Sequence, residues 1–453
     1  MRPMRQTIPL REVLDDAMAR LGMESLPPGV KAVQGMISRS KTPEPLEKGL
    51  LRARHGLHVF KDGTTRFDMT NLVLTHFRPE EIRLSAEQAR ALGYERDIHG
   101  APVTDARQLL ELRPQDVVVP EEAGDFLVRV AQFVDELLVR LYGLPPFYRV
   151  SSRDGLIGHL VVTLAPHTSG GVLGRVIGFT KARAWFNHPY MVAARRRNAD
   201  GDEDSVLLLL DCLVNFSRSF LPEKRGGLMD APLVLTVRID PNEIDKEAHN
   251  LDVAARYPLE FYRATERFAH PRELEPTMDL VSKRIGTVLQ YEGFGFTHRV
   301  QSVEAGPLTS AYLRGSMEEK MDAQLGLAMK IRAVDANDVV ARIVVHHFLP
   351  DLIGNLKRFS LQTFRCTKCS ARYRRMPLVG RCTAIVARRE CGGDLTLTVH
   401  EGSVKKYLEV TKRITREYPV SPYLLQRIAL IEDAISSLFT SDKAQDLKLD
   451  DFL

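Results

Sequence analysis

The sequence predicts an α+β protein built on a small β-barrel, with helical segments and a metal-binding module in its C-terminal third. Three observations support this class. Short runs of β-forming residues between about 156 and 259 are separated by Gly, Pro and Asp, which is typical of barrels. Residues 121–142 and 316–343 have a helical pattern or composition. Four of the five cysteines lie within residues 366–391, which indicates a bound metal.

Composition is that of an ordinary globular protein of 453 residues, long enough for several domains. A net charge of +5 and a pI of about 8.9 suit a polyanionic partner. No apolar run approaches the ~20 residues of a membrane span, and the first residues lack the apolar core of a signal peptide. Clustered cysteines favour a reducing compartment. We therefore expect a cytoplasmic protein with no membrane partner.

Pro, Gly and composition shifts divide the chain into five expected regions. They are an N-terminal α+β region (1–150), a barrel with a helical insertion (151–315), a helical connector (316–360), a zinc ribbon (361–400) and a C-terminal helical segment (401–453). In the first region, residues 58–67 predict a hairpin about Asp62-Gly63. A helix over 121–142 carries an apolar stripe and ends before Pro145-Pro146, a plausible boundary.

Three runs are the expected barrel strands: Leu160–Leu164, Gly174–Phe179 and Leu233–Arg238. The leucine-rich stretch Ser205–Phe220 ends before Pro222, and the resemblance given below implies that it is a helical insertion in the barrel. Because that stretch is apolar nearly all round, we expect it to be buried, with Cys212 as a small core residue.

An acidic loop precedes the leucine-rich stretch. Asn198, Asp200 and Asp202 alternate, so their oxygen-bearing side chains project to one side of an extended loop. Gly201 allows a bend and close approach of a ligand. Carboxylate and amide oxygens suit Mg²⁺, and Arg195, Arg196 and Arg197 immediately upstream can hold phosphates. The pattern indicates a metal-dependent phosphoryl-transfer centre.

Two other interpretations of this loop were weighed. A loop that caps the following helix through Asp204 or Ser205 would also be rich in Asp and Asn, and this alternative stays open. An EF-hand needs Gly at its sixth position and Glu at its twelfth. Counted from Asn198, those positions hold Glu203 and Leu209, so the EF-hand is excluded.

The stretch from Asn198 to Asp202 resembles the catalytic Asn-Ala-Asp-Phe-Asp-Gly-Asp loop of the two-barrel RNA polymerases. The flanking blocks are more similar to one family, the large catalytic subunit of archaeal family D DNA polymerase, over nearly the whole chain. Those blocks are Gly158–Leu160, Ala165–Ser169, Arg196–Asp204, Leu221–Gly227, Met229–Val234 and Tyr257–Tyr262. Family members are far longer, so the chain resembles their C-terminal portion.

This resemblance implies a double-psi β-barrel and template-directed DNA synthesis. Asp200 and Asp202 would hold two Mg²⁺ ions, and Asn198 would orient a ligand or the primer end. The candidates for phosphate contacts are Arg195, Arg196, Arg197, Lys224 and Arg225. The family also places residues 58–67 near the active centre, although an ordinary surface hairpin remains an alternative.

The implied partners are a primer-template with dNTPs, a small subunit with 3′–5′ exonuclease activity, and the N-terminal part of the large subunit. Without that part, which would carry the triphosphate-binding lysines, the chain is expected to be inactive. A non-catalytic DNA-binding module and a related two-barrel RNA polymerase are the alternatives.

The cysteine cluster begins with Cys366 and Cys369, a Cys-x2-Cys pair whose thiolates suit a tetrahedral zinc knuckle. Cys382 and Cys391 can complete a structural four-thiolate site. Their separation is longer than the Cys-x2-Cys of the family, so an extra loop must bulge between them. Basic residues around the cluster can contact a nucleic-acid backbone or form solvated surface: Lys368, Arg372, Arg374, Arg375, Arg388 and Arg389.

The C-terminal tail ends with three apolar residues, Leu449, Phe452 and Leu453, that one helical turn would place on one face. This arrangement resembles the short peptides that dock on sliding clamps, although Asp446 stands where such peptides carry Gln. A frayed terminus is the alternative. We expect a sliding clamp as a further partner.

Overall fold

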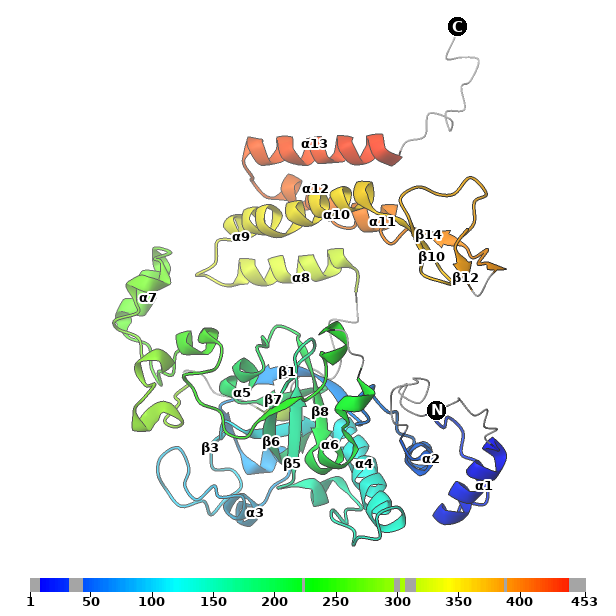
Figure 1. Ribbon diagram of the computed structural model, residues 1–453. Coiled ribbons are helices and arrows are strands. Elements are labelled where there is room, and N and C mark those ends of the chain that lie inside the picture. Colours follow the sequence, from blue (N-terminus) through cyan, green and yellow to red (C-terminus); the bar gives the residue numbers. More distant parts are fainter. Residues whose placement is uncertain are drawn as a thin grey trace. The chain divides into compact units, whose positions relative to one another are not determined.

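The computed structural model describes residues 9–31, 44–221, 225–296, 302–305, 315–386 and 389–439. The chain forms two compact units, Met1–Tyr262 with His270–Arg314, and Arg263–Ala269 with Gly315–Leu453 (Figure 1). Together they make a mixed α+β protein whose principal sheet lies in the first unit, which confirms the expected α+β class.

Six strands of the first unit form a closed ring. They are β1 (Phe67–Val73), β4 (Asp116–Pro120), β5 (Leu160–Leu164), β6 (Gly170–Thr180), β7 (Ala184–Asn187) and β8 (Glu203–Leu208). The hydrogen-bonded order is β4-β7-β1-β8-β5-β6, and β6 pairs with β4 again, so the ring closes. Pairs β1–β7 and β4–β6 are parallel, and the other four are antiparallel. A seventh strand, β9 (Val234–Thr236), lies parallel to the start of β6.

Most residues of the ring strands are buried, although β1 alternates between buried and more exposed positions. All five residues of β4 and all four of β7 are buried, and five of the six in β8. Such near-continuous burial explains why these segments read as apolar runs without polar alternation. The predicted strands at 160–164 and 174–179 are confirmed as β5 and part of β6, and the third is confirmed only over β9.

Helix α4 (Glu121–Arg140) follows β4 without a loop and confirms the predicted helix. Val130, Phe133 and Leu137 of its apolar stripe are buried, while Phe126 and Leu141 pack on the edge of the same core. That core joins α4 to strands β1, β4, β6, β7 and β8. The amphipathic pattern therefore identified the main helix that covers the barrel.

Shorter elements complete the first unit. They are α1 (Leu10–Leu21), α2 (Leu46–Arg54), β2 (His76–Phe77), η2 (Pro79–Ile82), α3 (Ala86–Ala91), β3 (Leu110–Glu111), η3 (Arg153–Leu156), α5 (Pro189–Ala194), α6 (Leu209–Asn215), η4 (Arg218–Phe220), η5 (Arg225–Leu228), η6 (Lys246–Asn250), η7 (Pro271–Glu273), η8 (Val281–Lys283), η9 (Val288–Gln290) and η10 (Val303–Ala305). Helix α7 (Leu259–Glu266) begins in the first unit, and its residues from Arg263 onward belong to the second. A second apolar cluster gathers Phe77, Ile82, Leu110 and Val118 under β2, η2 and β3.

The predicted helix over Ser205–Phe220 is wrong in its first part. Residues up to Leu208 belong to strand β8, and only Leu209–Asn215 form a helix, α6. A short apolar run fits a buried strand as well as a buried helix, so periodicity alone could not separate them. Cys212 is half-buried against a small apolar cluster, close to its expected role as a core residue.

The predicted hairpin over 58–67 is a tight turn without strands. Phe60 N–H donates to the Thr64 carbonyl and Gly63 N–H to the Phe60 carbonyl, and β1 begins only at Phe67. The Asp62 side chain is buried and accepts from the Thr64 amide and hydroxyl. A buried Asx-type turn thus replaces the predicted hairpin.

The predicted boundary at residue 150 does not separate structural units. Strands β1 and β4 lie before it and close the same ring as β5 to β8. After Pro145-Pro146 the chain turns back onto α4, where the amides of Phe147, Tyr148 and Arg149 donate to the Asp135 carboxylate. Proline ends the helix here but begins no new domain.

The second unit is a helical bundle that carries the cysteine cluster. Its helices are α8 (Met317–Lys330), α9 (Ala336–Ile343), the π-helix η12 (Val344–Phe348), α10 (Leu349–Leu361), α11 (Glu401–Lys405), α12 (Leu408–Glu417) and α13 (Pro422–Phe439). One apolar core joins residues 321–352 to residues 404–435. The expected connector and the expected C-terminal segment are therefore one structural unit, with the cysteine-bearing residues between them in sequence.

Helix α9 continues through η12 and α10, and this 26-residue stretch is long and apolar enough to span a membrane by length and composition alone. Val340, Val344, Phe348 and Leu352 face the bundle core. A core helix passes the same test, so the finding is weak evidence for a span. Pro350 lies next to η12, and its missing N–H accounts for the local widening of the helix.

Removal of a side chain beneath the barrel should destabilise the first unit. Leu137→Ala deletes buried atoms of α4 and should lower the free energy of unfolding by about 2–5 kcal/mol. Val139→Ala, on the exposed side of the same helix, should change it by about 0.5 kcal/mol or less. Urea unfolding followed by fluorescence of Trp185, the single tryptophan, reports this unit directly. Equal losses in the two variants would contradict the packing described.

Candidate active site and metal centre

The acidic loop links α5 to β8 and lies where β1 and β7 end. Because β1 and β7 are parallel and β8 runs antiparallel to β1, the loop leaves the ring beside Val73 and Asn187. Gly201 has φ +119°, in the region that favours glycine, which confirms the bend expected there. The loop is therefore fixed at both ends by the barrel and turns sharply between its two candidate ligands.

Asp200 and Asp202 both reach solvent but differ in their contacts. The Asp202 side chain is 36% exposed, accepts from the Asn198 amide through Oδ2 at 3.1 Å, and lies 3.5 Å from Arg197 Nη1. Within the described ranges, Asp202 Oδ1 and the exposed Asp200 carboxylate make no hydrogen bond or ion pair. These free carboxylate oxygens and the exposed Asn198 side chain lie on one short loop and are of the ligand type that suits Mg²⁺.

Arg195 is not a phosphate-contacting residue in this structure, and that prediction is corrected. Its side chain is fully buried, and its Nε lies 2.7 Å from Asp204 Oδ2. The guanidinium also donates to Thr163 Oγ1 at 3.2 Å and lies over the Trp185 ring. Three consecutive arginines gave no sign of which one points inward. Arg195 instead forms an ion pair inside the barrel.

Burial acts on both members of this pair. Desolvation raises the pKa of Asp204, while the nearby Arg195 guanidinium opposes that shift. Desolvation likewise lowers the pKa of Arg195, opposed by the Asp204 charge. Loss of either partner would leave a charge without compensation in the barrel interior, which is costly. Asp204 is thus paired with Arg195 in the barrel interior. Its carboxylate neither caps a helix nor faces a metal site.

Arg196 and Arg197 remain candidates for phosphate contacts. Arg196 is exposed, and both arginines line a cavity of about 480 Å³ together with Asn198, Ala199 and residues of η6. Lys224 and the clamp-binding candidates Leu449, Phe452 and Leu453 lie outside the described residues. Arg225 begins η5, and its side chain also lies outside the described part.

The turn at residues 58–67 lies beside the start of strand β8, the strand into which the acidic loop leads. Phe60, Arg66 and Asp68 share a cavity of about 240 Å³ with residues 203–205. Asp68 pairs in register with Ser205 and accepts from its hydroxyl. Arg66 stacks on Phe60 and donates to Asp62. This turn therefore shares a cavity with strand β8, and its place near the active centre stays a prediction.

Sequence reasoning missed Asn71, which contacts the loop from β1. Its backbone N–H donates to the Asp202 carbonyl at 2.9 Å, and its side chain donates to Asp204 Oδ2 at 2.7 Å. The available signal was period-two alternation along β1, where Asn71 shares the buried face with Met69. A polar residue at such a position needs partners in the interior.

The four cysteines form one cluster in the second unit, as predicted. Their Sγ atoms all lie within 4.8 Å of one another, with 3.7 Å between Cys366 and Cys391 and 3.4 Å between Cys369 and Cys382. Thiolates bound tetrahedrally to zinc at about 2.3 Å lie about 3.8 Å apart. Backbone N–H groups of Cys369 and Lys368 point at Cys366 Sγ and lower the pKa of that thiol. Donor type and spacing therefore fit zinc.

Two small sheets hold this cluster. Strands β10 (Phe364–Cys366), β11 (Arg372–Tyr373) and β14 (Leu395–Thr396) form one. The residues between Cys382 and Cys391 contribute the other, in which β12 (Ile385–Val386) pairs with β13 (Arg389–Glu390).

The extra segment expected between Cys382 and Cys391 contains this second sheet. Cys391 N–H donates to the Ala384 carbonyl and Gly392 N–H to the Cys382 carbonyl. At Gly393 a Cβ atom would lie 2.7 Å from Cys366 Sγ, so glycine is required. The Tyr373 hydroxyl lies 3.1 Å from Cys382 Sγ, a contact that the sequence did not reveal.

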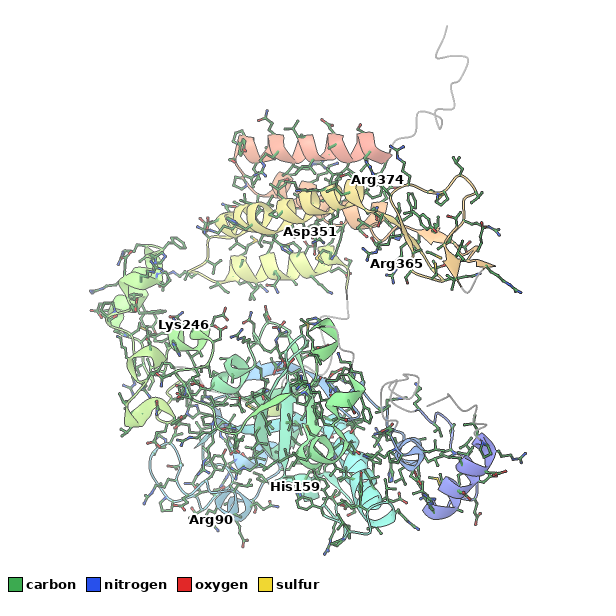
Figure 2. All side chains as sticks on the ribbon, in the orientation of Figure 1. Arg90, His159, Lys246, Asp351, Arg365 and Arg374 are labelled. Carbon is green, nitrogen blue, oxygen red and sulfur yellow. The ribbon has the colours of Figure 1, made fainter. Side chains whose placement is uncertain are left out.

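Basic side chains surround the cysteine cluster. Arg365 and Arg374 extend from this part of the second unit (Figure 2), and both are exposed. Four further predicted residues, Lys368, Arg372, Arg375 and Arg389, are exposed as well, and Arg388 lies outside the described residues. Their exposure is consistent with either a nucleic-acid contact or a solvated surface.

Comparison with known proteins gives one consistent family. The family model described as "DNA polymerase II large subunit DP2, catalytic domain" matches residues 23–346. The chain is 54% identical over 447 residues to the DNA polymerase II large subunit of Methanococcoides burtonii, covering 98% of this chain and 38% of that protein. It is 54% identical over 450 residues to the one of Methanocella arvoryzae, covering 99% and 39%. The Archaeoglobus fulgidus relative is 51% identical over 451 residues, again covering 99% and 39%.

Loss of the buried guanidinium should be far more destabilising than loss of its neighbour. Arg195→Ala leaves Asp204 unpaired in the barrel and should lower the free energy of unfolding by about 3–5 kcal/mol. Arg196→Ala removes an exposed arginine and should cost about 0.5 kcal/mol or less. Circular dichroism during urea unfolding measures both, since Trp185 fluorescence is altered by loss of the arginine above its ring.

A double variant sharpens this measurement. Arg195→Met with Asp204→Leu removes both charges and should lose less stability than the sum of the single losses. Single variants that are as stable as Arg196→Ala would contradict a buried ion pair.

Proposed function

Because this chain belongs to the family of DNA polymerase II large subunits, we propose that it carries part of the catalytic centre of a replicative DNA-directed DNA polymerase. The chain spans about 38–39% of the length of the first three relatives. The proposed activity therefore belongs to the assembled enzyme. We further propose that the six-stranded ring is a double-psi β-barrel.

One observation carries the proposal for the site. Asp200 and Asp202 present uncommitted carboxylate oxygens on a loop that turns at Gly201, while Asp204 beyond them is anchored in the barrel. A loop that merely capped a helix would direct its carboxylates at helical N–H groups. Here residues 203–208 form a strand, so no helix begins where the capping alternative requires one.

In the proposed reaction Asp200 and Asp202 hold Mg²⁺, and Asn198 orients a ligand or the primer end. Bound Mg²⁺ would activate the primer 3′ hydroxyl and stabilise the leaving pyrophosphate. Arg196 and Arg197 contact phosphates from the wall of the adjoining cavity. Such contacts set affinity and its salt dependence without choosing the sequence.

The second unit serves assembly in this proposal. Zinc bound by the four cysteines would hold the small sheets together, because a closed thiolate site is structural. The proposed partners are the small exonuclease subunit, the sliding clamp and the N-terminal part of the large subunit. That N-terminal part would supply the lysines that contact the incoming triphosphate, so the chain alone should not extend a primer.

Loss of either ligand should abolish synthesis. In the assembled polymerase, Asp200→Ala and Asp202→Ala should each lower primer extension at least about 100-fold, because no carboxylate then fixes the metal. DNA binding measured by fluorescence anisotropy should persist, and exposed Asp154→Ala serves as a control. Unchanged extension would favour a non-catalytic DNA-binding module instead.

Zinc content tests the second site. The chain should contain one zinc per molecule by plasma mass spectrometry, and Cys382→Ser should lose most of it, because the fourth thiolate is missing. Cys212→Ser changes the one cysteine outside the cluster and should keep the metal. Full zinc occupancy in Cys382→Ser would exclude Cys382 as a ligand.

A further inference from the structure

Asn71 is buried at the end of the β1–β8 ladder and makes two hydrogen bonds to the acidic loop. The regular pairing of the two strands ends at Thr70 and Glu203. Beyond it, the Asn71 backbone N–H donates to the Asp202 carbonyl at 2.9 Å, and Asn71 Nδ2 lies 3.2 Å from the same oxygen. Backbone pairing between the two strands accounts for the first hydrogen bond but not for the second, which comes from the side chain. The side chain adds a second donor to the carbonyl of one candidate metal ligand.

The same amide group is held from its other side. Asn71 Oδ1 accepts from Arg195 Nη2 at 2.7 Å, and Nδ2 donates to Asp204 Oδ2 at 2.7 Å. With the amide reversed, its NH₂ group would face the guanidinium and its oxygen would face the carboxylate. The Arg195–Asp204 ion pair therefore fixes which way Asn71 points, and Asn71 in turn fixes the loop.

Simple core packing does not account for this arrangement. Asn215 is a buried asparagine of the same unit and likewise donates to a buried carboxylate, that of Asp211, at 2.8 Å. Its contacts with described residues lie within α6 and the turn before β1, away from residues 198–204. Among the described residues, Asn71 alone links the buried Arg195–Asp204 ion pair to the backbone of Asp202. Asn71 and Asn215 are therefore alike in burial and in side-chain chemistry. They differ in that Asn71 contacts the acidic loop and Asn215 does not.

We propose that Asn71 is a positioning residue for the metal site, acting through the backbone of Asp202. The proposal rests on the proposed function, in which Asp202 binds the catalytic divalent cation. Metal-ligand groups must be held within about 0.5 Å of their working positions. The Asp202 carboxylate has few other constraints, since its own side-chain contacts come from the exposed part of the loop. Asn71 supplies the constraint from the rigid barrel.

The test uses the assembled polymerase with full-length large subunit and Mn²⁺ as the probe. Free Mn²⁺ measured by electron paramagnetic resonance gives the binding affinity without any reaction. Asn71→Ala should weaken Mn²⁺ binding about 10–100-fold, as loss of groups that orient metal ligands does. Half-saturation of primer extension by Mg²⁺ should rise in parallel, while the KM for nucleotide changes little at saturating metal.

Asn215→Ala is the control, because it loses a comparable buried hydrogen bond and should keep wild-type Mn²⁺ affinity. If Asn71→Ala does not fold, Asn71→Ser retains a small polar side chain that is too short to bond Asp202 and Asp204 together. It should show the same loss of metal affinity. Thermal melting of all variants separates loss of stability from loss of metal.

Two results distinguish failure of this inference from failure of the proposed function. Mn²⁺ affinity within about two-fold of wild type in the Asn71 variants, with strong loss in Asp202→Ala, would overturn the positioning role alone. Wild-type affinity and extension in Asp202→Ala would overturn both. An equal loss of affinity in Asn71→Ala and Asn215→Ala would also contradict the inference, because it would reflect general destabilisation.

Discussion

A guanidinium and a carboxylate meet inside the barrel, where neither can be hydrated. Arg195 ends the short helical turn after β7, and Asp204 is the second residue of β8. Their side chains are fully buried and 2.7 Å apart. Burial of a charge is tolerated only when its partner and hydrogen bonds are in place. The ion pair therefore fixes both ends of the loop of residues 196–203. Because this loop is short, fixing its ends restricts the conformations that it can adopt.

Three aspartates in five residues consequently have different surroundings. Asp200 is exposed, Asp202 is partly exposed and touches its own loop, and Asp204 is enclosed by Arg195 and Asn71. Four strands of the ring contribute contacts to the buried Arg195 side chain. They are β1 through Asn71, β5 through Thr163, β7 through the Trp185 ring and β8 through Asp204. The two outer carboxylates reach solvent, whereas the inner one is committed to an ion pair in the barrel.

The elements that could be predicted from the sequence are those marked by a local pattern of apolar residues or by the spacing of metal ligands. The stripe of α4, the apolar strands β5 and β6, and the spacing of Cys366 and Cys369 follow directly from periodicity or ligand geometry. Prediction from the sequence failed where the deciding fact was tertiary. Nothing in three adjacent arginines marks Arg195 as the buried one, and the apolar run after Asp204 is compatible with strand or helix. Asn71 was missed because its partners lie more than a hundred residues away.

Domain boundaries failed for the same reason. Proline residues after α4 suggested an end, but strands on both sides of them close one ring. The helices on either side of the cysteine cluster share a single apolar core that composition could not reveal. Ring closure and a shared core depend on contacts between segments that are far apart in the sequence. The residues of a single segment carry little information about such contacts.

The most direct measurement is a high-resolution structure of the assembled polymerase with primer-template, nucleotide and Mn²⁺. The buried ion pair predicts metal density at the carboxylates of Asp200 and Asp202, with Arg195 still enclosed beside Asp204. Metal density away from both carboxylates, or Arg195 released from the barrel onto a phosphate, would contradict the central claim.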